Sequence, residues 1–479
     1  MMLEVHDMAV FFHDRIKSEE AVAAFHLSME PGEIVGVVGE SGSGKTTAAL
    51  AIMGLLKRHA SVESGSVVFD GRDLLSCTRS ELRDVQGRDI SMIFQEPLSS
   101  LDPVMRSGRQ VEEALRLHSE LDDETIRSRA FAALSDAGLD PETVYSKYPH
   151  ELSGGQRQRV MIAAALITHP RLLIADEPTT ALDSGTQKQI LLLLGELAKK
   201  YGMGILFISH DLKTVRGFCE RVLVMQKGRI VEEGPADRVF TEPQEEYTKT
   251  LLNAYPDHSP CSSRLEEPVL TVRDLRAWYG KKQVLDGVSL TVYNKEILGL
   301  VGESGCGKST LARCILGFVK NTEGEIRHYT KLPQMVFQDP YSSLNPARKV
   351  GWILEEPLLI RGGTARAERK ERVRCALARV ELDPSFAERY PSQLSGGQRQ
   401  RISIALALML GSRFIVIDEG LSALDVTIQG KIMKLLDTLH VEEELSYLFI
   451  SHDLDAVSHM CDRVLIMKNG RTEEISGGF

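Results

Sequence analysis

The chain lacks any apolar run long enough to cross a membrane. Its longest such runs, residues 160–167 and 402–410, fall well short of the roughly 20 residues that a spanning helix needs. Its start also lacks the basic segment and apolar core of a secretory signal, and it already carries Glu4 and Asp7. We therefore expect a cytosolic chain that contacts a membrane only through a partner.

Paired cysteines and an excess of basic charge are missing too. The seven cysteines are scattered without a Cys-x-x-Cys pair, so zinc sites and disulfide frameworks are poorly supported. The chain has 57 lysines and arginines against 67 acidic residues, a net charge of −10. A wide nucleic-acid footprint needs a concentrated basic surface, so we expect no nucleic-acid partner.

The composition and the internal repeats decide the organisation. The 479 residues are 43% hydrophobic and 26% charged, which is typical of a globular protein with sizeable cores. GESGSGKTT, which begins at Gly39, recurs as GESGCGKST at Gly302, and LSGGQRQR recurs 242 residues after its first occurrence. The chain is therefore a duplication. The glycine-rich strings lie 263 residues apart, so the second copy is shorter near its front.

Prolines mark the junction between the copies. Pro243, Pro256, Pro260 and Pro268 lie among polar and acidic residues, and a strand-like VLTV string follows them. We expect a first domain at residues 1–240, a linker at 241–267 and a second domain at 268–479.

Each glycine-rich string lies between an apolar strand and a predicted helix. The strands are residues 34–38 and 297–301, and the helices are residues 46–56 and 309–318, which predicts an α/β fold. Glycines let backbone N–H groups approach phosphates at a helix start, a lysine supplies a cation, and a hydroxyl can ligate magnesium. The predicted ATP-binding residues of these strings are Gly39, Ser41, Gly42, Gly44, Lys45, Thr46 and Thr47 in the first copy, and Gly302, Ser304, Gly305, Gly307, Lys308, Ser309 and Thr310 in the second.

Further along, an apolar run in each copy ends in an Asp-Glu pair. The pairs are Asp176 with Glu177 and Asp418 with Glu419. A buried parallel strand delivers such residues to the carboxyl edge of its sheet. We expect the aspartates to hold magnesium through water and the glutamates to polarise the attacking water as general bases.

LSGGQ at residues 152–156 and 394–398 resembles the signature of the ATP-binding-cassette family, which other phosphate-loop proteins lack. The resemblance covers nearly the whole chain, including TALD and SALD at residues 180–183 and 422–425. It implies two phosphate-loop ATPase domains in tandem, each with a RecA-like α/β core, an antiparallel β arm and an α-helical subdomain.

In that family two cassettes pack head to tail, so the resemblance implies that the two halves of this chain pair with each other. Ser153, Gly155 and Gln156 would then contact ATP held at Lys308, and Ser395, Gly397 and Gln398 would contact ATP held at Lys45. His210 and His452 would sense the γ-phosphate. Gln95 and Gln338 would act in catalysis and, with Thr46, Ser309, Asp176 and Asp418, as magnesium ligands.

The family also stacks an aromatic side chain on adenine. Phe12 and Tyr279 precede the glycine-rich strings at suitable positions. The assignment is stronger for Tyr279, because Phe11 competes with Phe12, and a lone aromatic residue in a strand also serves core packing.

FQEPLSSLDP at residues 94–103 and FQDPYSSLNP at 337–346 resemble the importers of oligopeptides, dipeptides and nickel. The resemblance implies a subunit on the cytoplasmic face of the membrane that docks two permease subunits through their coupling helices. An external substrate-binding protein would complete the system. The chain departs from these relatives at Gly420, where they have proline, and in its linker, where only Cys261 remains of a cysteine cluster. We therefore expect no iron-sulfur cluster.

Two other functions within the same family remain open. A ribosomal translation factor also has two cassettes, but its long basic linker contrasts with the six acidic residues at 241–268 in this chain. A sugar-importer ATPase typically has a degenerate second glycine-rich string, whereas Lys308 and Glu419 are intact here.

Overall fold

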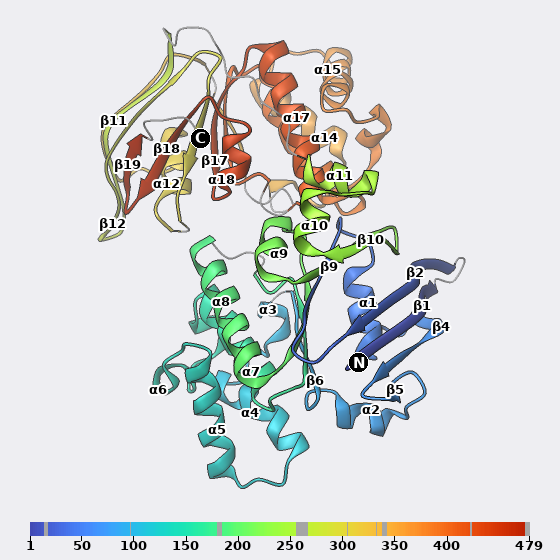
Figure 1. Ribbon diagram of the computed structural model, residues 1–479. Coiled ribbons are helices and arrows are strands. Elements are labelled where there is room, and N and C mark those ends of the chain that lie inside the picture. Colours follow the sequence, from blue (N-terminus) through green and yellow to red (C-terminus); the bar gives the residue numbers. More distant parts are fainter. Residues whose placement is uncertain are drawn as a thin grey trace. The chain divides into compact units, whose positions relative to one another are not determined.

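The computed structural model describes residues 1–13, 18–95, 97–179, 184–254, 267–303, 305–331, 333–337, 343–421 and 424–474. The chain divides into two compact units, Met1–Leu252 and Asn253–Phe479 (Figure 1). Each unit is an α/β domain with a central sheet, a separate β arm and a group of helices, which confirms the predicted fold class. Within the described residues, no helix is both long and apolar enough to span a membrane.

The central sheet of the first unit has six strands in the order β10-β9-β3-β8-β7-β6. All but β10 run parallel, and the parallel strands are almost entirely buried, as expected when helices cover both faces. The strands are β3 (Ile34–Val38), β6 (Ile90–Ile93), β7 (Leu172–Asp176), β8 (Gly204–Ile208), β9 (Arg221–Gln226) and β10 (Arg229–Pro235).

The β arm of this unit is an antiparallel sheet in the order β2-β1-β4-β5. Its strands are β1 (Leu3–His13), β2 (Ser18–Met29), β4 (Ala60–Phe69) and β5 (Arg72–Asp73). Buried side chains of β1, β2 and β4 form one hydrophobic cluster with helix α1 (Lys45–Ile52). The arm is therefore fixed to the helix that follows the first glycine-rich string.

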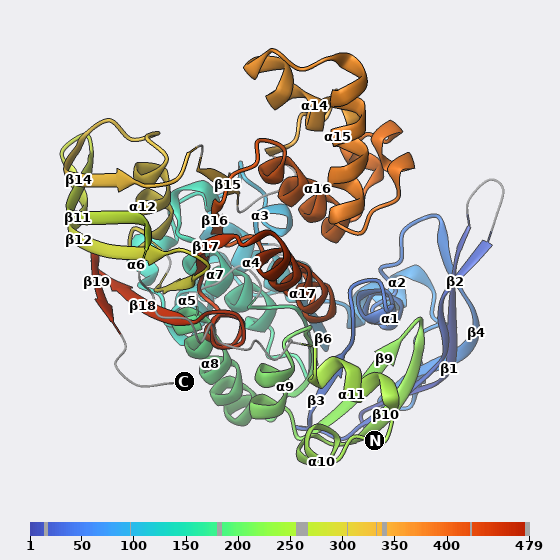
Figure 2. The same ribbon diagram turned by 90° about the horizontal axis from the view of Figure 1, so that it is seen from above.

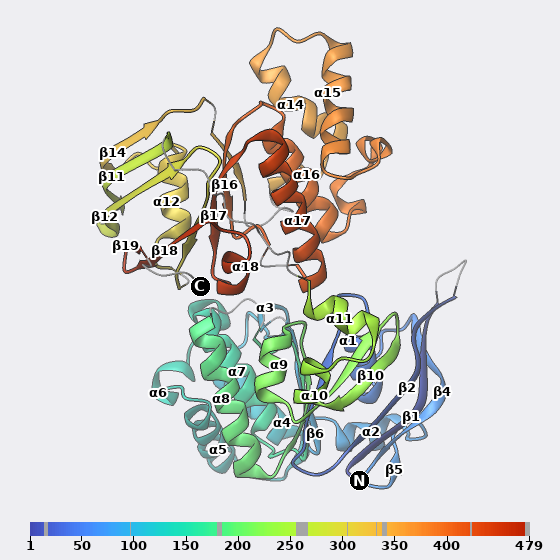
Figure 3. The same cartoon turned by 45° about the horizontal axis from the view of Figure 1, so that its top comes forward.

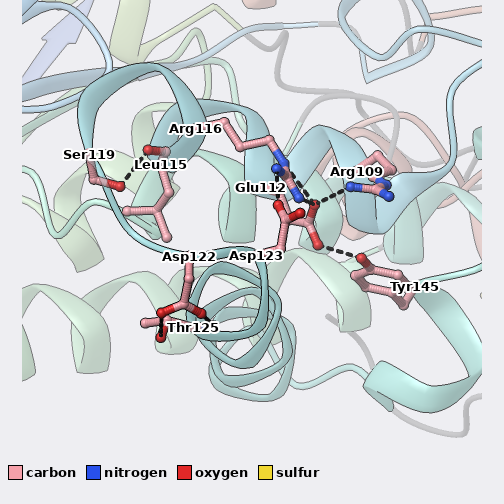
Figure 4. Close-up of polar contacts among 9 residues, drawn as sticks. All are labelled: Arg109, Glu112, Leu115, Arg116, Ser119, Asp122, Asp123, Thr125 and Tyr145. Carbon is pink, nitrogen blue, oxygen red and sulfur yellow. Dashed lines mark hydrogen bonds and ion pairs between the residues drawn. The ribbon is translucent and has the colours of Figure 1, made fainter.

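The helical subdomain consists of α3 (Pro97–Ser100), α4 (Ser107–His118), α5 (Asp123–Asp136), α6 (Pro141–Val144) and α7 (Gly154–Leu166). Its helices form a hydrophobic cluster of their own. Glu112, only 1% exposed, accepts hydrogen bonds from Arg109, Arg116 and Tyr145 (Figure 4). Because its charge is paired, this burial is tolerated. Figure 3 shows the β arm and the helical subdomain on opposite sides of the central sheet.

The remaining helices of the first unit are α2 (Arg79–Val85), α8 (Ser184–Tyr201), α9 (Leu212–Phe218), α10 (Ala236–Thr241) and α11 (Glu246–Leu252). Helix α11 lies in the segment that we predicted to be linker, yet Tyr247, Leu251 and Leu252 pack in the core of the first unit. Residues 255–266 of that segment, with Cys261, lie outside the described residues.

The second unit repeats this plan. Its central sheet has the order β15-β16-β17-β13-β18-β19, and its arm has the order β12-β11-β14. The strands are β11 (Pro268–Tyr279), β12 (Lys282–Tyr293), β13 (Ile297–Val301), β14 (Thr322–His328), β15 (Gln334–Val336), β16 (Phe414–Asp418), β17 (Ser446–Ser451), β18 (Arg463–Lys468) and β19 (Arg471–Glu474). The shortening of this copy lies between β14 and β15, because β5 and α2 of the first unit occupy the corresponding place.

The main helices of the second unit are α12 (Lys308–Ile315), α14 (Val350–Arg361), α15 (Arg366–Arg379), α16 (Gly396–Leu408), α17 (Val426–Glu443) and α18 (Leu454–Ser458). Helices α14 and α15 lie at the opposite end of this unit from the arm strands β11, β12 and β14 (Figure 2).

The helices after the glycine-rich strings end earlier than we predicted. Helix α1 stops at Ile52 and α12 at Ile315, because Gly54 and Gly317 adopt positive φ angles of 65° and 73° two residues later. Glycine adopts this left-handed conformation without steric cost, so it terminates a helix.

Candidate functional site

The first glycine-rich string forms a loop that wraps around the Lys45 side chain. Lys45 begins α1 and is 6% exposed, and its Nζ donates to the carbonyl oxygens of Gly39 and Glu40 at 2.7 and 2.8 Å. Gly44 caps the helix at φ 100°, and a Cβ atom there would lie 2.7 Å from the Ala21 carbonyl oxygen of β2. Only glycine therefore allows the loop to lie this close to the arm.

The second loop has the same geometry. Lys308 Nζ donates to the carbonyl oxygens of Gly302 and Glu303 at 2.7 and 3.0 Å, and Gly307 caps α12 at φ 115°. Ser304, which we predicted to bind ATP, lies outside the described residues. Each loop thus presents a buried lysine at a helix start, where backbone N–H groups and the helix dipole favour a phosphate.

A hydroxyl and a buried aspartate meet beside each loop. Thr46 Oγ1 donates to Asp176 Oδ1 at 3.2 Å, and Ser309 Oγ donates to Asp418 Oδ1 at 3.1 Å. Burial raises the pKa of Asp176 to about 6, and it also raises the pKa of Asp418. Burial of an anionic carboxylate is costly, so a cation bound here would relieve that cost.

The neighbouring glutamate of the first unit contacts two other predicted site residues. Glu177 Oε1 lies 3.1 Å from His210 Nδ1, and its Oε2 accepts a hydrogen bond from Gln95 Nε2 at 2.9 Å. Burial disfavours the charged form of His210, but the hydrogen bond and negative charge of Glu177 outweigh burial and raise the pKa of His210. The structure therefore brings Gln95, Glu177 and His210 together from three different segments.

The second unit places its glutamate between a histidine and the loop lysine. Glu419 Oε1 lies 3.7 Å from His452 Nδ1 and 3.5 Å from Lys308 Nζ. The neighbouring His452 and the positive charge of Lys308 lower the pKa of Glu419 and favour its ionised form. Gln338 lies outside the described residues, as do residues 180–183 and 422–423 of the TALD and SALD strings.

The signature residues begin a helix in each unit. Ser153 accepts a hydrogen bond from the Gln156 backbone N–H at 3.3 Å, and the Gln156 side chain accepts one from the Ser153 N–H at 3.0 Å. Ser395 and Gln398 form the same reciprocal cap on α16. Ser153, Gly155 and Gln156 also line a hollow of about 330 Å³ in the first unit, together with Arg159.

The predicted adenine-stacking residues lie at or next to the end of the first strand of each arm. Phe12 pairs with Glu19 in the β1–β2 ladder and its ring lies 5.5 Å from that of His59. Tyr279 pairs with Lys282 and is 48% exposed, so its side chain is accessible to a ligand.

Sequence reasoning missed one contact to the first loop. The Glu40 backbone N–H donates to the Tyr247 hydroxyl oxygen at 3.1 Å, although Tyr247 lies in the predicted linker, more than 200 residues along the chain. The apolar spacing of residues 247, 251 and 252, typical of a short amphipathic helix, was the available signal.

Comparisons with known proteins support the resemblance to the ATP-binding-cassette family. The family model for ABC transporters matches residues 22–180 and 285–422. The peptidoglycan transport ATP-binding protein YejF of Agrobacterium fabrum is 44% identical, over 99% of this chain and 92% of that protein. The uncharacterized ABC transporter ATP-binding protein YejF of Escherichia coli is 42% identical, over 99% and 95% of the two chains. The glutathione import ATP-binding protein GsiA of Pectobacterium atrosepticum is 38% identical, over 99% and 86%.

Matches to the family model cover both units, and the relatives align with almost the whole chain. The buried lysine, the hydroxyl with its aspartate, and the glutamate with its histidine recur in both units. The chain therefore belongs to the ATP-binding-cassette (ABC) transporter family and is an ATP-hydrolysing protein with two cassettes in tandem.

Proposed function

We propose that this chain is the subunit that energises an importer of peptide-type solutes by hydrolysing ATP at two sites. The observation that carries the proposal is the recurrence of one arrangement, a loop lysine beside an Asp-Glu pair and a histidine, in both units. The peptide class is supported by two relatives, which are named for peptidoglycan transport and glutathione import. Glutathione and the cross-links of peptidoglycan both contain short peptides, which favours this class over chelated nickel.

Lys45 and Lys308 bind the terminal phosphates of ATP in this proposal. Each is held by two carbonyl oxygens of its own loop, so its ammonium group is oriented before the nucleotide arrives. Gly39, Ser41, Gly42, Gly44 and Thr47 of the first loop, and Gly302, Ser304, Gly305, Gly307 and Thr310 of the second, line the phosphates. Phe12 and Tyr279 stack on adenine.

The hydroxyl and aspartate of each site fit a magnesium ion. Both supply oxygen atoms, which Mg²⁺ prefers, and the buried aspartate carries a raised pKa that a cation would reverse. Thr46 and Asp176 would hold the ion with Gln95, and Ser309 and Asp418 would hold it with Gln338. When bound, magnesium supplies charge neutralisation for the phosphate oxygens.

Glu177 and Glu419 act as general bases toward the attacking water. His210 lies within hydrogen-bonding distance of Glu177, and it orients that carboxylate and senses the γ-phosphate; His452 does the same for Glu419. The contact between Lys308 and Glu419 opens when phosphate binds, because the lysine then has a more highly charged partner.

The two cassettes of one chain pair head to tail in this proposal. Ser153, Gly155 and Gln156 then contact the ATP held at Lys308, and Ser395, Gly397 and Gln398 contact the ATP held at Lys45. The capped starts of α7 and α16 support this role, because they present N–H groups suited to an anion. Two permease subunits at the cytoplasmic face of the membrane and an external binding protein complete the importer.

Uptake of a labelled tripeptide tests the proposed cargo. Cells that lack this chain are expected to regain ATP-dependent uptake when the wild-type chain is supplied, but not when the Glu177→Gln, Glu419→Gln double variant is supplied. A labelled nickel chelate serves as the control cargo. Restored nickel uptake without tripeptide uptake contradicts the peptide class, and restored uptake with the double variant contradicts the role of ATP hydrolysis.

Replacing Asp176 with asparagine is expected to stabilise the nucleotide-free chain while abolishing magnesium-dependent turnover at the first site. The pKa of this carboxyl is raised from 3.8 to about 6, so its ionised form costs about 2 to 3 kcal/mol at pH 7. The gain in the free energy of unfolding of Asp176→Asn over the wild type is full above pH 6. It shrinks as the pH falls toward 3.8, the pKa of this carboxyl in the unfolded chain, and vanishes below that pH. Urea denaturation at pH 5 and pH 7.5 measures this gain in stability. An equal gain at both pH values would contradict the raised pKa of Asp176.

A further inference from the structure

The turns that carry the two catalytic glutamates share a backbone conformation but differ in the next residue. Glu177 and Glu419 both adopt φ 47°, and each backbone N–H donates at 2.9 Å to the neighbouring strand, at Ile208 and Ile450. Pro178 follows the first glutamate, whereas Gly420 follows the second. Proline restricts the backbone and glycine leaves it freest, so the second turn lacks a stiffening residue of its own.

The side chain of Gln400 fills the space that a residue larger than glycine would need at position 420. A Cβ atom on Gly420 would lie 2.7 Å from Gln400 Nε2 and 3.2 Å from Ile417 Cγ2. Gln400 lies on α16, the helix that the signature residue Ser395 caps. A side chain of the signature helix therefore packs directly against the turn that follows Glu419.

The polar amide of Gln400 contributes little to the stability of the fold. It is 1% exposed, and its Oε1 has no hydrogen-bond partner within the described part of the chain. A buried polar atom without a partner lowers stability, so an apolar side chain of similar size would stabilise the fold more.

We propose that Gln400 is a positioning residue for the second ATP site. Its side chain packs beside Gly420 and restricts the turn, and the restricted turn aims the Glu419 carboxylate at the attacking water. Because Gln400 belongs to the signature helix, movement of that helix changes the aim of the general base in the same cassette. The inference rests on the proposed role of Glu419 as general base.

The first cassette provides an internal control. Gln158 holds the same place on α7, is 2% exposed, and has an unpartnered Nε2 within the described residues. Pro178 by itself restricts the backbone of the first turn. Removal of the Gln158 side chain is therefore expected to leave the orientation of the Glu177 carboxylate unchanged. Replacing either glutamine with alanine removes a buried side chain of the same size, and the two variants are expected to lose similar stability.

The experiment compares ATP turnover of full-length Gln400→Ala, Gln158→Ala, Glu419→Gln and the Gln400→Ala, Gly420→Pro double variant. Gln400→Ala is expected to cause at least about half of the turnover loss that Glu419→Gln causes, with the KM for ATP within about twofold of wild type. Gln158→Ala is expected to keep most of its turnover. In the double variant the alanine makes room for the proline ring, so turnover recovers by at least about half of the loss.

Four outcomes would overturn the inference. Equal turnover losses in Gln400→Ala and Gln158→Ala would show that both glutamines only support the helix. Absence of recovery in the double variant would show that the turn does not need restriction. If Glu419→Gln itself leaves turnover unchanged, the proposed catalytic role of Glu419 fails and the inference fails with it, whereas a loss in Glu419→Gln without one in Gln400→Ala refutes the inference alone.

Discussion

Replacing Arg463 with methionine is expected to destabilise the second unit by about 3 to 5 kcal/mol, the usual cost of a buried charge that loses its partner. Glu296 is 0% exposed and pairs with Arg463 at 2.9 Å. The same guanidinium donates to the Thr291 carbonyl oxygen at 2.7 Å, so it joins β18 to β12 as well. In the variant, Glu296 keeps the Tyr293 N–H as a donor but loses its counter-charge.

Both tryptophans of the chain, Trp278 and Trp352, lie in the second unit, so their fluorescence follows the unfolding of that unit in urea. The matched control is Arg221→Met in the first unit, followed by circular dichroism. Its partner Glu33 is 18% exposed and can be rehydrated, so a smaller loss is expected there. Equal losses in the two variants would contradict the account of the buried pair.

The loss of stability in Arg463→Met is also expected to depend on pH. Burial already raises the pKa of Glu296 above its usual 4.5, and removal of Arg463 raises it further. A carboxyl group whose pKa is raised by folding costs stability above its unfolded pKa. The deficit of the variant is therefore full at neutral pH and shrinks as acidification protonates Glu296. A deficit independent of pH would contradict this reason.

Much of the site could be predicted from the sequence because its chemistry is local. The glycine-rich loop needs glycine at the left-handed position before Lys45, and that requirement is visible in the residues themselves. The apolar run ending in Asp176 and Glu177 indicates a buried parallel strand, and the structure forms one at Leu172–Asp176. The duplication then extends each assignment to the second half.

Contacts between distant segments could not be predicted in this way. The hydrogen bond from Glu40 to Tyr247 depends on helix α11 packing against the first unit. The position of Gln400 beside Gly420 depends on how α16 packs against the end of β16. Tertiary packing decides both contacts, and the sequence patterns around Tyr247 and Gln400 do not reveal which distant residue each one meets.

Steady-state ATP turnover with magnesium tests the central claim, which is that both cassettes are catalytic. Glu177→Gln and Glu419→Gln each remove one proposed general base while preserving side-chain size and the capacity for hydrogen bonding. Loss of a general base lowers the rate by about 10²- to 10⁴-fold at the site concerned. The control for folding is nucleotide binding, which each variant is expected to retain.

Each single variant is expected to lose a large part of the turnover, and the double variant is expected to lose essentially all of it. This expectation rests on the proposed roles of the two pairs, Glu177 with His210 and Glu419 with His452, which lie in corresponding places in the two units. Wild-type turnover in Glu419→Gln would show that the second cassette binds ATP without hydrolysing it, and would contradict the claim.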